Sequence, residues 1–491
     1  MGRPQVEIAK PVFDIIPLKP PVADLGIFLN NTLLGLSKVE PSFLSVKGRD
    51  RLVPDGLTEI RRYHRSFSVK RDQSDLLHLQ IRIISRREVD VYLPVLLQHA
   101  KIRRMLSYSV MQKLGHVFEL GPIRPPSEAH SLLIRATRNC PWNRCQFCPV
   151  YKGSKFELRP VGEVIRDIEA VEAITEGIEE MAWTTGYGDK VRDVAATVCS
   201  QPQYGHCVCH VALWLGTGGK TAFLQDSNTL IMRTPELKQV ITLLRGTFPS
   251  LDRVTTYARS HTAARKSLAE LKELKDAGLD RIHIGMETGY DPLLAYMEKG
   301  CTAKNHIEGG RKVKEAGISL CEYVMPGLGG KKMCQEHARE TAKALNEIDP
   351  DYIRLRSLHV SPAMPLWTRL QDGDFELQTE DELVNEIAVF IQNLQVTSYL
   401  KSDHILNLLM EVEGKMPEDK EQCLTIIDRY LSLPDEERLN FKVGRRTGLY
   451  DWLADLGDSY KHDKIDQAMK SLGGQGGDVE EAIVKLKNSF I

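Results

Sequence analysis

The sequence has little cysteine, no excess of either charge and no long apolar run. Its ten cysteines are about 2% of the 491 residues, too few for a disulfide scaffold in a chain of this length. The 65 lysines and arginines balance 66 aspartates and glutamates, so a uniformly basic nucleic-acid coat is excluded. No stretch reaches the roughly 18 uncharged apolar residues of a spanning helix, and prolines and acids interrupt the start where a signal peptide needs an apolar run. We therefore expect a cytoplasmic protein with no membrane partner, whose cysteines are thiols or metal ligands.

The remaining composition is that of a globular protein, with 42% apolar and 27% charged residues. The length suggests two or three domains. We expect a basic N-terminal region over residues 1–120, with short strands at 79–84 and 89–93 and a helix over 94–114. Residues 45–114 carry a net charge of +8, which leaves −9 for the rest. This excess indicates either a docking face for an anionic partner or a solvated surface.

From residue 131 onward, apolar strand-like runs alternate with helical patterns. The predicted strands cover residues 132–136, 221–224, 253–257, 281–285, 319–325 and 352–358. Helical patterns over 264–277 and 303–316 each end before a glycine, Gly278 and Gly317, which suits a helix C-terminus. Strands alternating with helices predict a parallel sheet. We expect an α/β fold: a partial (β/α)6 TIM-type barrel over 121–370, with an N-terminal α+β region. A helical C-terminal extension is expected over 371–491, where Thr379 and Glu382 form a capping-box pattern.

Three cysteines lie close together just after the first predicted strand. Cys140, Cys145 and Cys148 have the spacing C-x4-C-x2-C, with Phe147 directly before the third. Thiolates so close in sequence can converge on one iron–sulfur cluster, each ligating a different iron. Because a [4Fe-4S] cluster has four irons, three cysteines leave one iron open to a small molecule. The alternatives are unrelated buried thiols or zinc, which usually takes four protein ligands in paired spacing, and no matching C-x2-C follows.

This loop resembles the signature of the radical S-adenosylmethionine (radical SAM) enzymes. Most of them space the cysteines C-x3-C-x2-C with an aromatic residue before the third, so the x4 gap is a departure. The resemblance implies that the open iron binds SAM, and that one electron cleaves its S–C5′ bond to a radical that abstracts hydrogen from a substrate. It covers about residues 131–365. The branch it most resembles contains oxygen-independent coproporphyrinogen oxidases, the Elongator catalytic subunit and the methylthiotransferases.

The resemblance also implies SAM-binding positions just after the second and third strands. Gln225, Asp226 and Ser227 occupy the place of the segment that meets the methionine amino group. Asp226 could accept a hydrogen bond from that cationic amine, or it could be a loop-capping residue. Ser260, with Arg259 before it, lies just past the third strand.

Further positions follow at the later strands. Gly285 and Glu287 resemble the motif G-x-E-S/T-G, whose acid faces the ribose and methionine region. Pro326 and Gly327 resemble a turn that brings backbone close to adenine, which needs a residue without a side chain. The sixth strand carries arginines at two alternate positions, 354 and 356, which face the same side of the sheet.

Several other features have two interpretations each. Cys199 and the segment 206–210, with Cys207 and Cys209, could bind a second metal, or they could be thiols packed along a helix. Residues 214–221 imitate a phosphate-binding loop, but the first glycine is replaced by tryptophan and the run leads into a strand, so we expect a helix stop. His404 is either a substrate-side acid or base or a helix-packing residue. Arg135 and Arg138 flank the cysteine loop and could tune its field or be structural.

Taken together, the sequence predicts a radical SAM enzyme that uses a [4Fe-4S] cluster and S-adenosyl-L-methionine on an unidentified substrate. The substrate is a small molecule, or RNA bound with the basic N-terminal region. A flavodoxin- or ferredoxin-type electron donor is implied as a partner. A different class also stays open, a non-catalytic Fe-S binding or sensor protein. The sequence names no catalytic side chain.

Overall fold

The computed structural model describes residues 107–474 except 189 and 202, together with 67–68, 80–81, 483 and 486. Most of the predicted N-terminal region therefore lies outside the described residues. Within it, β1 Phe67–Ser68 pairs antiparallel with β2 Gln80–Ile81. The chain divides into two compact units, Met1–His116 with Ala173–Gly216, and Val117–Glu172 with Thr217–Ile491.

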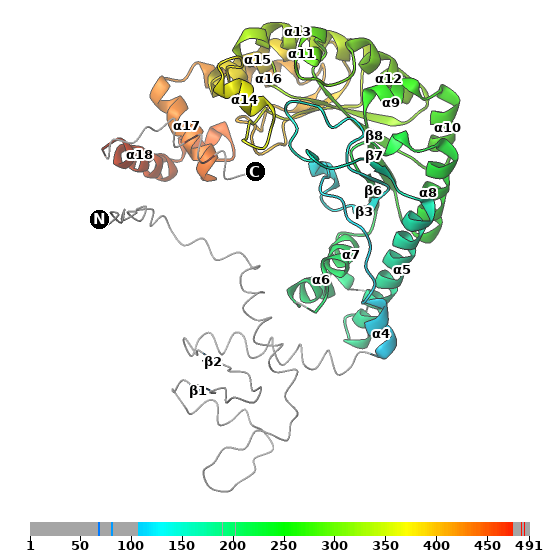
Figure 1. Cartoon of the computed structure of the whole chain (residues 1–491). Coiled ribbons are helices and arrows are strands. Elements are labelled where there is room, and N and C mark those ends of the chain that lie inside the picture. Colours follow the sequence, from blue (N-terminus) through cyan, green and yellow to red (C-terminus); the bar gives the residue numbers. More distant parts are fainter. Residues whose placement is uncertain are drawn as a thin grey trace, which may run out of the picture. The chain divides into compact units, whose positions relative to one another are not determined.

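An eight-stranded sheet forms the centre of the second unit, in the order β12-β11-β10-β9-β8-β7-β6-β3 (Figure 1). Its strands are β3 Leu132–Arg135, β6 Thr221–Gln225, β7 Arg253–Ala258, β8 Arg281–Glu287, β9 Ser319–Val324, β10 Tyr352–Leu355, β11 Tyr399–Lys401 and β12 Gly414–Lys415. All neighbouring strands run parallel except β11 and β12. The first six are the strands that the sequence predicts, so the α/β fold with a partial TIM-type barrel is confirmed.

Helices connect the parallel strands and cover one face of the sheet (Figure 1). They are α8 Thr234–Thr247, α9 Ser260–Arg265, α10 Leu268–Asp276, α11 Asp291–Tyr296, α12 Ala303–Glu315 and α13 Gly330–Ile348. The face toward these helices is apolar, with fully buried side chains such as Leu224, Ile284 and Leu320. We call the opposite face the inner face. It is more polar, and on it Tyr257 lies beside His283, and Tyr323 beside Arg354.

The helix predicted over 264–277 is divided into α9 and α10. Ser267 has an extended backbone and caps α10 by accepting a hydrogen bond from the Glu270 amide. The first helix, α9, therefore ends at Arg265, before this cap. The predicted helix ends are confirmed, since Gly278 and Gly317 have φ values of 106° and 77°. Such left-handed conformations favour glycine because it has no Cβ.

The C-terminal residues contain more than helices. α14 Leu366–Gln371, α15 Glu380–Asn393, α16 Lys420–Leu431, α17 Asp435–Thr447 and α18 Ser459–Gly474 are present, and the predicted capping box of Thr379 and Glu382 opens α15. The expectation of a helical extension without strands after residue 370 is wrong, because β11 extends the parallel sheet beside β10. β11 has three residues and β12 two, which is too short for a periodic pattern in sequence.

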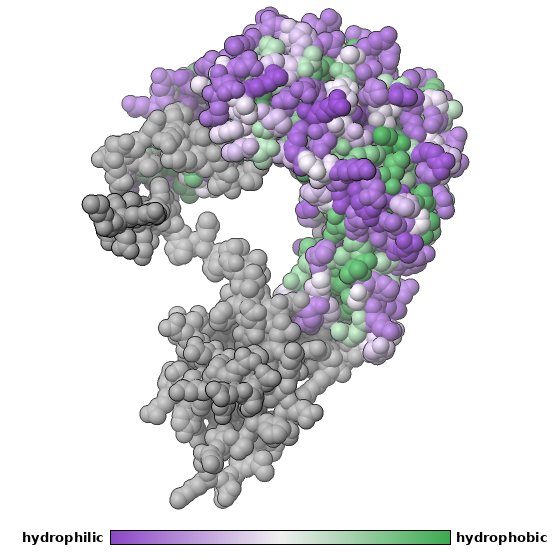
Figure 2. Space-filling model, in the orientation of Figure 1, coloured by the Kyte–Doolittle hydropathy of each residue, from purple (hydrophilic) through white to green (hydrophobic). Residues whose placement is uncertain are grey.

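The first unit contains α4 Tyr108–Lys113, α6 Val191–Ser200 and α7 His206–Gly216, and α5 Val161–Thr184 crosses the division between the units. Figure 2 shows a largely hydrophilic surface on the visible face, with hydrophobic residues gathered around α5 and α7. Trp183 of α5 is 70% exposed and Leu213 of α7 is 52% exposed. No helix among the described residues has the length and apolar character needed to cross a membrane.

Candidate functional site

The three predicted ligands lie in one loop above the carboxyl end of β3. The loop leaves the sheet through β4 Thr137–Arg138, which pairs antiparallel with β5 Glu157–Leu158 where the chain returns. Asn139 and Asn143 turn the loop with φ values of 65° and 49°, a region that asparagine tolerates better than most residues. The Asn139 side chain donates a hydrogen bond to the carbonyl of Lys155 at 2.6 Å. The loop is therefore held closed at its base.

Asp226, just after β6, fixes the start of this loop from the adjacent strand. Its carboxylate is fully buried and forms an ion pair with Arg135 at 2.8 Å. It also accepts hydrogen bonds from the Asn139 amide at 3.1 Å and from the Tyr151 hydroxyl. These partners occupy both of its oxygens, so the geometry favours the loop-holding interpretation over contact with a cationic amine.

Its two neighbours also have protein partners. Gln225 is fully buried and binds the connector before β3, accepting from the Gly121 amide at 2.8 Å and donating to the Ile123 carbonyl at 2.6 Å. Ser227 is half-buried and donates to the Asn139 carbonyl at 3.1 Å. Of this predicted triplet, Ser227 alone keeps part of its surface exposed.

Arg135 and Arg138, which flank the loop, belong to a charged network. Glu119 pairs with Arg135 at 2.9 Å and with Arg138 at 2.6 Å, and Arg138 also pairs with Glu163 at 2.9 Å. Hydrogen bonds from Arg138 lower the pKa of Glu119 despite its partial burial. The geometry therefore favours the structural interpretation, since the guanidinium groups of both arginines hold the base of the loop.

The three thiols are free and partly buried. Burial raises the pKa of Cys145, while the nearby charges of Lys299 and Arg259 lower it. Burial likewise raises the pKa of Cys148, and Lys299 again opposes the rise. Cys140 interacts electrostatically with both other thiols, so the three lie within range of one another. Positive groups beside buried thiols favour the thiolate form that ligates iron.

An apolar cluster supports the loop from one side. Phe147 is 8% exposed and packs with Leu293, Met297 and Leu358, and Cys145 and Cys148 contact this cluster. Among the described residues, no group of three or more His, Cys, Asp or Glu side chains is arranged to hold a single metal ion. A cluster has a different requirement, because each of its thiolates ligates a different iron. Free, partly buried thiols beside cations and apolar walls fit such a group.

Glu287 and Gly285 lie at the carboxyl end of β8. Glu287 forms an ion pair with Lys299 at 3.1 Å, and both side chains are largely buried. A Cβ atom on Gly285 would lie 2.3 Å from Glu287 Oε1, so glycine is needed for the carboxylate to take this position. Burial lowers the pKa of Lys299, but Glu287 and Cys145 raise it above its usual range. Lys299 thus links the Glu287 carboxylate to the cysteine loop.

Ser260 opens α9 and is buried. Its hydroxyl contacts Nδ1 of His306, whose Nε2 lies 3.4 Å from Cys301 Sγ. Burial lowers the pKa of His306 to about 3, so the imidazole is neutral at physiological pH. Cys301 borders a surface pocket of about 570 Å³ whose wall also includes Trp142, from the cysteine loop. The side chain of Ser260 is directed to this histidine.

The turn after β9 carries Pro326 and Gly327, both buried, with Gly327 at a φ of 87°. The Gly327 amide donates to Glu386 Oε1 of α15 at 2.8 Å. His337 of α13 contacts the Met325 carbonyl through Nε2 at 3.1 Å and Thr288 Oγ1 through Nδ1 at 2.8 Å. This histidine therefore joins the segments that follow β8 and β9.

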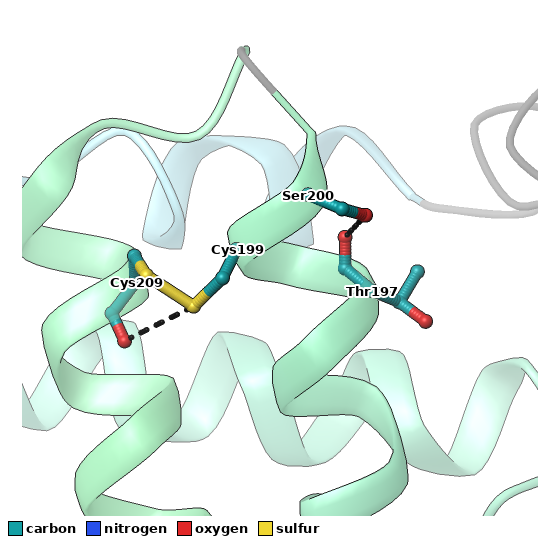
Figure 3. Close-up of a disulfide and its surroundings, with 4 residues drawn as sticks. All are labelled: Thr197, Cys199, Ser200 and Cys209. Carbon is teal, nitrogen blue, oxygen red and sulfur yellow. Dashed lines mark hydrogen bonds between the residues drawn. A yellow bond between two sulfur atoms is a disulfide. The ribbon is translucent and has the colours of Figure 1, made fainter. Parts of the chain in front are cut away.

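The second group of cysteines does not form a metal site. Cys199 and Cys209 are joined by a disulfide between α6 and α7 (Figure 3). Cys207 is a separate, buried thiol. Residues two apart on a helix point to nearly opposite sides, so Cys207 and Cys209 cannot converge on one metal. The expectation that every cysteine is a thiol or a metal ligand is wrong for this pair, because the pairing depends on how two helices meet.

Two further features are placed as follows. α7 ends at Gly216 and the chain continues into β6, so residues 214–221 form the expected helix stop. His404 lies in a loop after β11, not on a helix, and is half-buried. Burial and the charge of Arg356 lower its pKa to about 4.

Sequence reasoning missed several residues that support the site. Lys299, His337 and Glu386 lie 12, 12 and 59 residues from Glu287, Met325 and Gly327, which they contact, and none belongs to a recognisable motif. Cations near a thiolate cluster are an expected requirement. The sequence contains many lysines, however, and only the fold selects this one.

Comparison with known proteins gives a match for part of the chain. Residues 217–343 match the family model described as the radical SAM superfamily. The tRNA uridine(34) acetyltransferase of Methanocaldococcus jannaschii is 23% identical over 122 residues, which are 24% of this chain and 22% of that protein. The heme chaperone HemW of Bacillus subtilis is 24% identical over 33% of this chain and 43% of its own length. The chain thus spans less than half the length of these curated relatives.

Among solved structures, coproporphyrinogen III oxidase (HemN) of Escherichia coli is similar with a TM-score of 0.36 and 15% identity, over 58% of this chain and 56% of that chain. The Elp3 protein of Methanocaldococcus infernus has a TM-score of 0.32 and 14% identity, over 43% of this chain and 54% of its own.

Proposed function

The chain carries a domain of the radical SAM superfamily, and on that premise we propose that it is an enzyme that cleaves S-adenosylmethionine reductively and abstracts hydrogen from a substrate. Members of this superfamily use a [4Fe-4S] cluster and SAM. The observation that carries the proposal is the set of three free, partly buried thiols in one loop at the carboxyl edge of a parallel sheet. In TIM-type folds, this edge is where active sites form.

In this proposal Cys140, Cys145 and Cys148 ligate the cluster. When bound, the cluster supplies one electron to SAM and its open iron holds the methionine end. Lys299 and Arg259 stabilise the thiolates, since both lower the pKa of Cys145. The apolar cluster around Phe147 keeps water away from one side of the loop.

Residues at the strand ends bind SAM in the same proposal. Glu287 accepts from the ribose hydroxyls, held in place by Lys299. Gly285 leaves room for the Glu287 carboxylate, and the turn at Pro326 and Gly327 presents backbone to adenine. Ser227, which follows β6 and keeps part of its surface exposed, is assigned to the methionine end.

Three of the predicted cofactor-binding residues take a different role. Asp226 and Gln225 position the loop and the connector, because their buried polar atoms already have protein partners. Ser260 supports His306 from within the fold. All three act on the cofactor through other groups.

The test is anaerobic reconstitution with iron, sulfide, dithionite and SAM, with 5′-deoxyadenosine as the measured product. We expect about four irons per chain and steady product formation. Cys148→Ala should lose both. Cys334→Ala is the matched control, because Cys334 is also a free, partly buried thiol but belongs to α13 and not to the loop. Product formation by Cys148→Ala at the rate of the control would contradict the proposal.

Two alternatives give different outcomes in the same assay. A non-catalytic Fe-S sensor would bind about four irons and form no 5′-deoxyadenosine, even with cell extract as a source of substrate. An RNA-modifying enzyme is favoured by the match to an archaeal tRNA uridine(34) acetyltransferase. It would bind tRNA with an affinity that falls steeply with salt, and tRNA would stimulate product formation. A cytoplasmic location and a flavodoxin- or ferredoxin-type donor complete the proposal.

A further inference from the structure

A group of polar side chains on the inner face of the sheet has no role in the proposed cluster and SAM sites. It consists of Tyr257 on β7, Tyr323 on β9, Arg354 and Arg356 at the end of β10, and His404 after β11. Tyr323 lies beside Arg354 in the parallel register, and Arg354 and Arg356 alternate along the strand. We call these residues the tyrosine–arginine group. They lie near the carboxyl ends of their strands, as substrate-binding residues do in such folds.

Two buried polar atoms of this group have no hydrogen-bond partner within the described residues. They are the Tyr323 hydroxyl and Nε of Arg354. These two residues are 8% and 7% exposed. Arg354 is held at its other end by an ion pair with Asp403. Buried polar atoms are nearly always hydrogen-bonded in folded proteins, to the chain itself, to water or to a ligand, so these two donors are available to a bound group.

Arg356 provides a second, independent observation. It is exposed at the carboxyl edge of the sheet, and within residues 107–474 no carboxylate pairs with it. Its charge nevertheless reaches the group, since it lowers the pKa of His404, which burial and this charge together bring to about 4. Burial raises the pKa of Tyr257, and Arg356 opposes that rise. His404 and both tyrosines are thus neutral at pH 7.

The acids on the inner face around this group are already paired, and Glu322, which has no hydrogen-bond partner among the described residues, alternates with Tyr323 and so lies on the opposite face of β9. Asp403 pairs with Arg354, Glu287 with Lys299, and Glu128 with Arg253. The charge of Arg356 is therefore left without compensation beside neutral hydrogen-bond donors. Guanidinium groups match the planar oxygens of carboxylates and phosphates, and such charge-assisted hydrogen bonds are strong.

We propose that the tyrosine–arginine group binds a carboxylate or phosphate group of a small-molecule substrate, with Arg356 and Tyr323 donating to its oxygens. This rests on the proposed function and adds the substrate class to it. The aromatic side chains of Phe223 and Tyr257, whose ring centroids are 5.0 Å apart, lie on the same face and suit the apolar remainder of such a molecule.

The experiment uses the reconstituted full-length enzyme and the low-molecular-mass part of a cell extract. An anion-exchange resin divides this extract at neutral pH, and each fraction is assayed for stimulation of 5′-deoxyadenosine formation. The readout is the ratio of stimulated to unstimulated rate in the same variant. We expect the stimulating compound to bind the resin, and Arg356→Gln to lower kcat/KM for it by at least roughly tenfold, the loss of one hydrogen bond to a charged group.

Arg339→Gln on α13 is the matched control, because Arg339 is also exposed and lies outside the group. Tyr323→Phe should show a smaller loss in the same direction. Phosphatase treatment of the active fraction separates the two sources, since it abolishes stimulation by a phosphate ester and leaves a carboxylate unchanged.

The proposal is overturned if the stimulating compound passes through the resin, if only the macromolecular part of the same extract stimulates the enzyme, or if Arg356→Gln equals the control. It is also overturned if Arg356→Gln raises the KM for SAM by the same factor, because the group would then bind the cofactor.

Titration with inorganic phosphate and with succinate tests whether the tyrosine–arginine group binds an anion in the absence of turnover. Wild type should bind one of them at least tenfold tighter than Arg356→Gln, and equal binding contradicts the site. Absence of 5′-deoxyadenosine in every assay would instead reject the proposed function.

Discussion

Glu386 offers a direct test of the contacts beneath the turn after β9. This residue of α15 is 2% exposed and accepts a hydrogen bond from the Gly327 amide through Oε1, while Oε2 has no partner among the described residues. Burial raises its pKa from an ordinary 4.5 to about 8, and the bond from Gly327 offsets this only in part. The folded protein therefore keeps this carboxyl protonated at neutral pH.

The sign of the effect on stability follows from proton binding. Between pH 4.5 and about 8 the folded chain holds a proton on Glu386 that the unfolded chain has released. The free energy of unfolding therefore decreases as pH rises through this window, by roughly 1.4 kcal/mol per pH unit. At pH 7 the accumulated cost is about 3 kcal/mol, against about 1 kcal/mol at pH 5.

Glu386→Gln keeps an oxygen acceptor for the Gly327 amide and removes the titration. Its amide nitrogen must occupy the unpartnered position of Oε2, but that cost is the same at both pH values. We expect the stability difference between variant and wild type to shift by roughly 2 kcal/mol in favour of the variant from pH 5 to pH 7. Urea unfolding followed by circular dichroism at the two pH values measures this difference.

The control is Glu336→Gln, an exposed carboxylate on α13 that should follow the wild-type pH dependence. Other titrating groups cancel, because each variant is compared with wild type at the same pH. A difference between Glu386→Gln and wild type that stays constant from pH 5 to pH 7 would refute the reasoning. It would mean that Glu386 is ionised in the folded protein.

Three further predictions concern the site. Gly285→Ala places a Cβ 2.3 Å from Glu287 Oε1 and should weaken SAM binding by roughly tenfold with little loss of secondary structure; unchanged affinity in a SAM titration would contradict this. Asp226→Asn removes a buried partner of Arg135 and should destabilise the protein by about 3 kcal/mol and lower its iron content, measured by urea unfolding and iron assay. Burial lowers the pKa of His337 to about 4, so this residue reduces the stability of the folded protein as pH falls below 6.5. His337→Gln should therefore flatten the dependence of the urea midpoint on pH between pH 6.5 and 4. A midpoint profile parallel to that of the wild type would contradict this.

The sequence predicts the strands and the thiol ligands because both depend on neighbouring residues. Each of the first six strands is a short apolar run, and two of the helices between them end at a glycine with positive φ. Three cysteines within nine residues can reach one small cluster whatever the rest of the chain does. β11 escaped prediction because three residues carry no period, and the Cys199–Cys209 disulfide because it requires the packing of α6 on α7.

The roles of the supporting residues could not be decided from the sequence, because their partners lie at long sequence separations. Asp226 lies 87 residues from the Asn139 amide that it binds, and Glu386 lies 59 residues from Gly327. In the sequence, an acidic residue that pairs with a cation cannot be distinguished from one that stays protonated in the core. Asp226, paired with Arg135, holds the loop as an ion-pair partner, whereas Glu386 has no cation at hydrogen-bond distance and stays protonated. Only the fold decides between these states.

The residues after 370 contribute directly to the two strand ends that carry the proposed binding groups. Glu386 binds the turn after β9, and Asp403 pairs with Arg354 on β10. Removing these residues would leave the Gly327 amide and the Arg354 guanidinium without these partners, and each buried unpaired group costs about 1–3 kcal/mol or more. It would also expose the edge of β10 that β11 covers. A chain ending at residue 370 should therefore lose affinity for SAM and for the proposed anionic substrate together, even though all three cysteines remain.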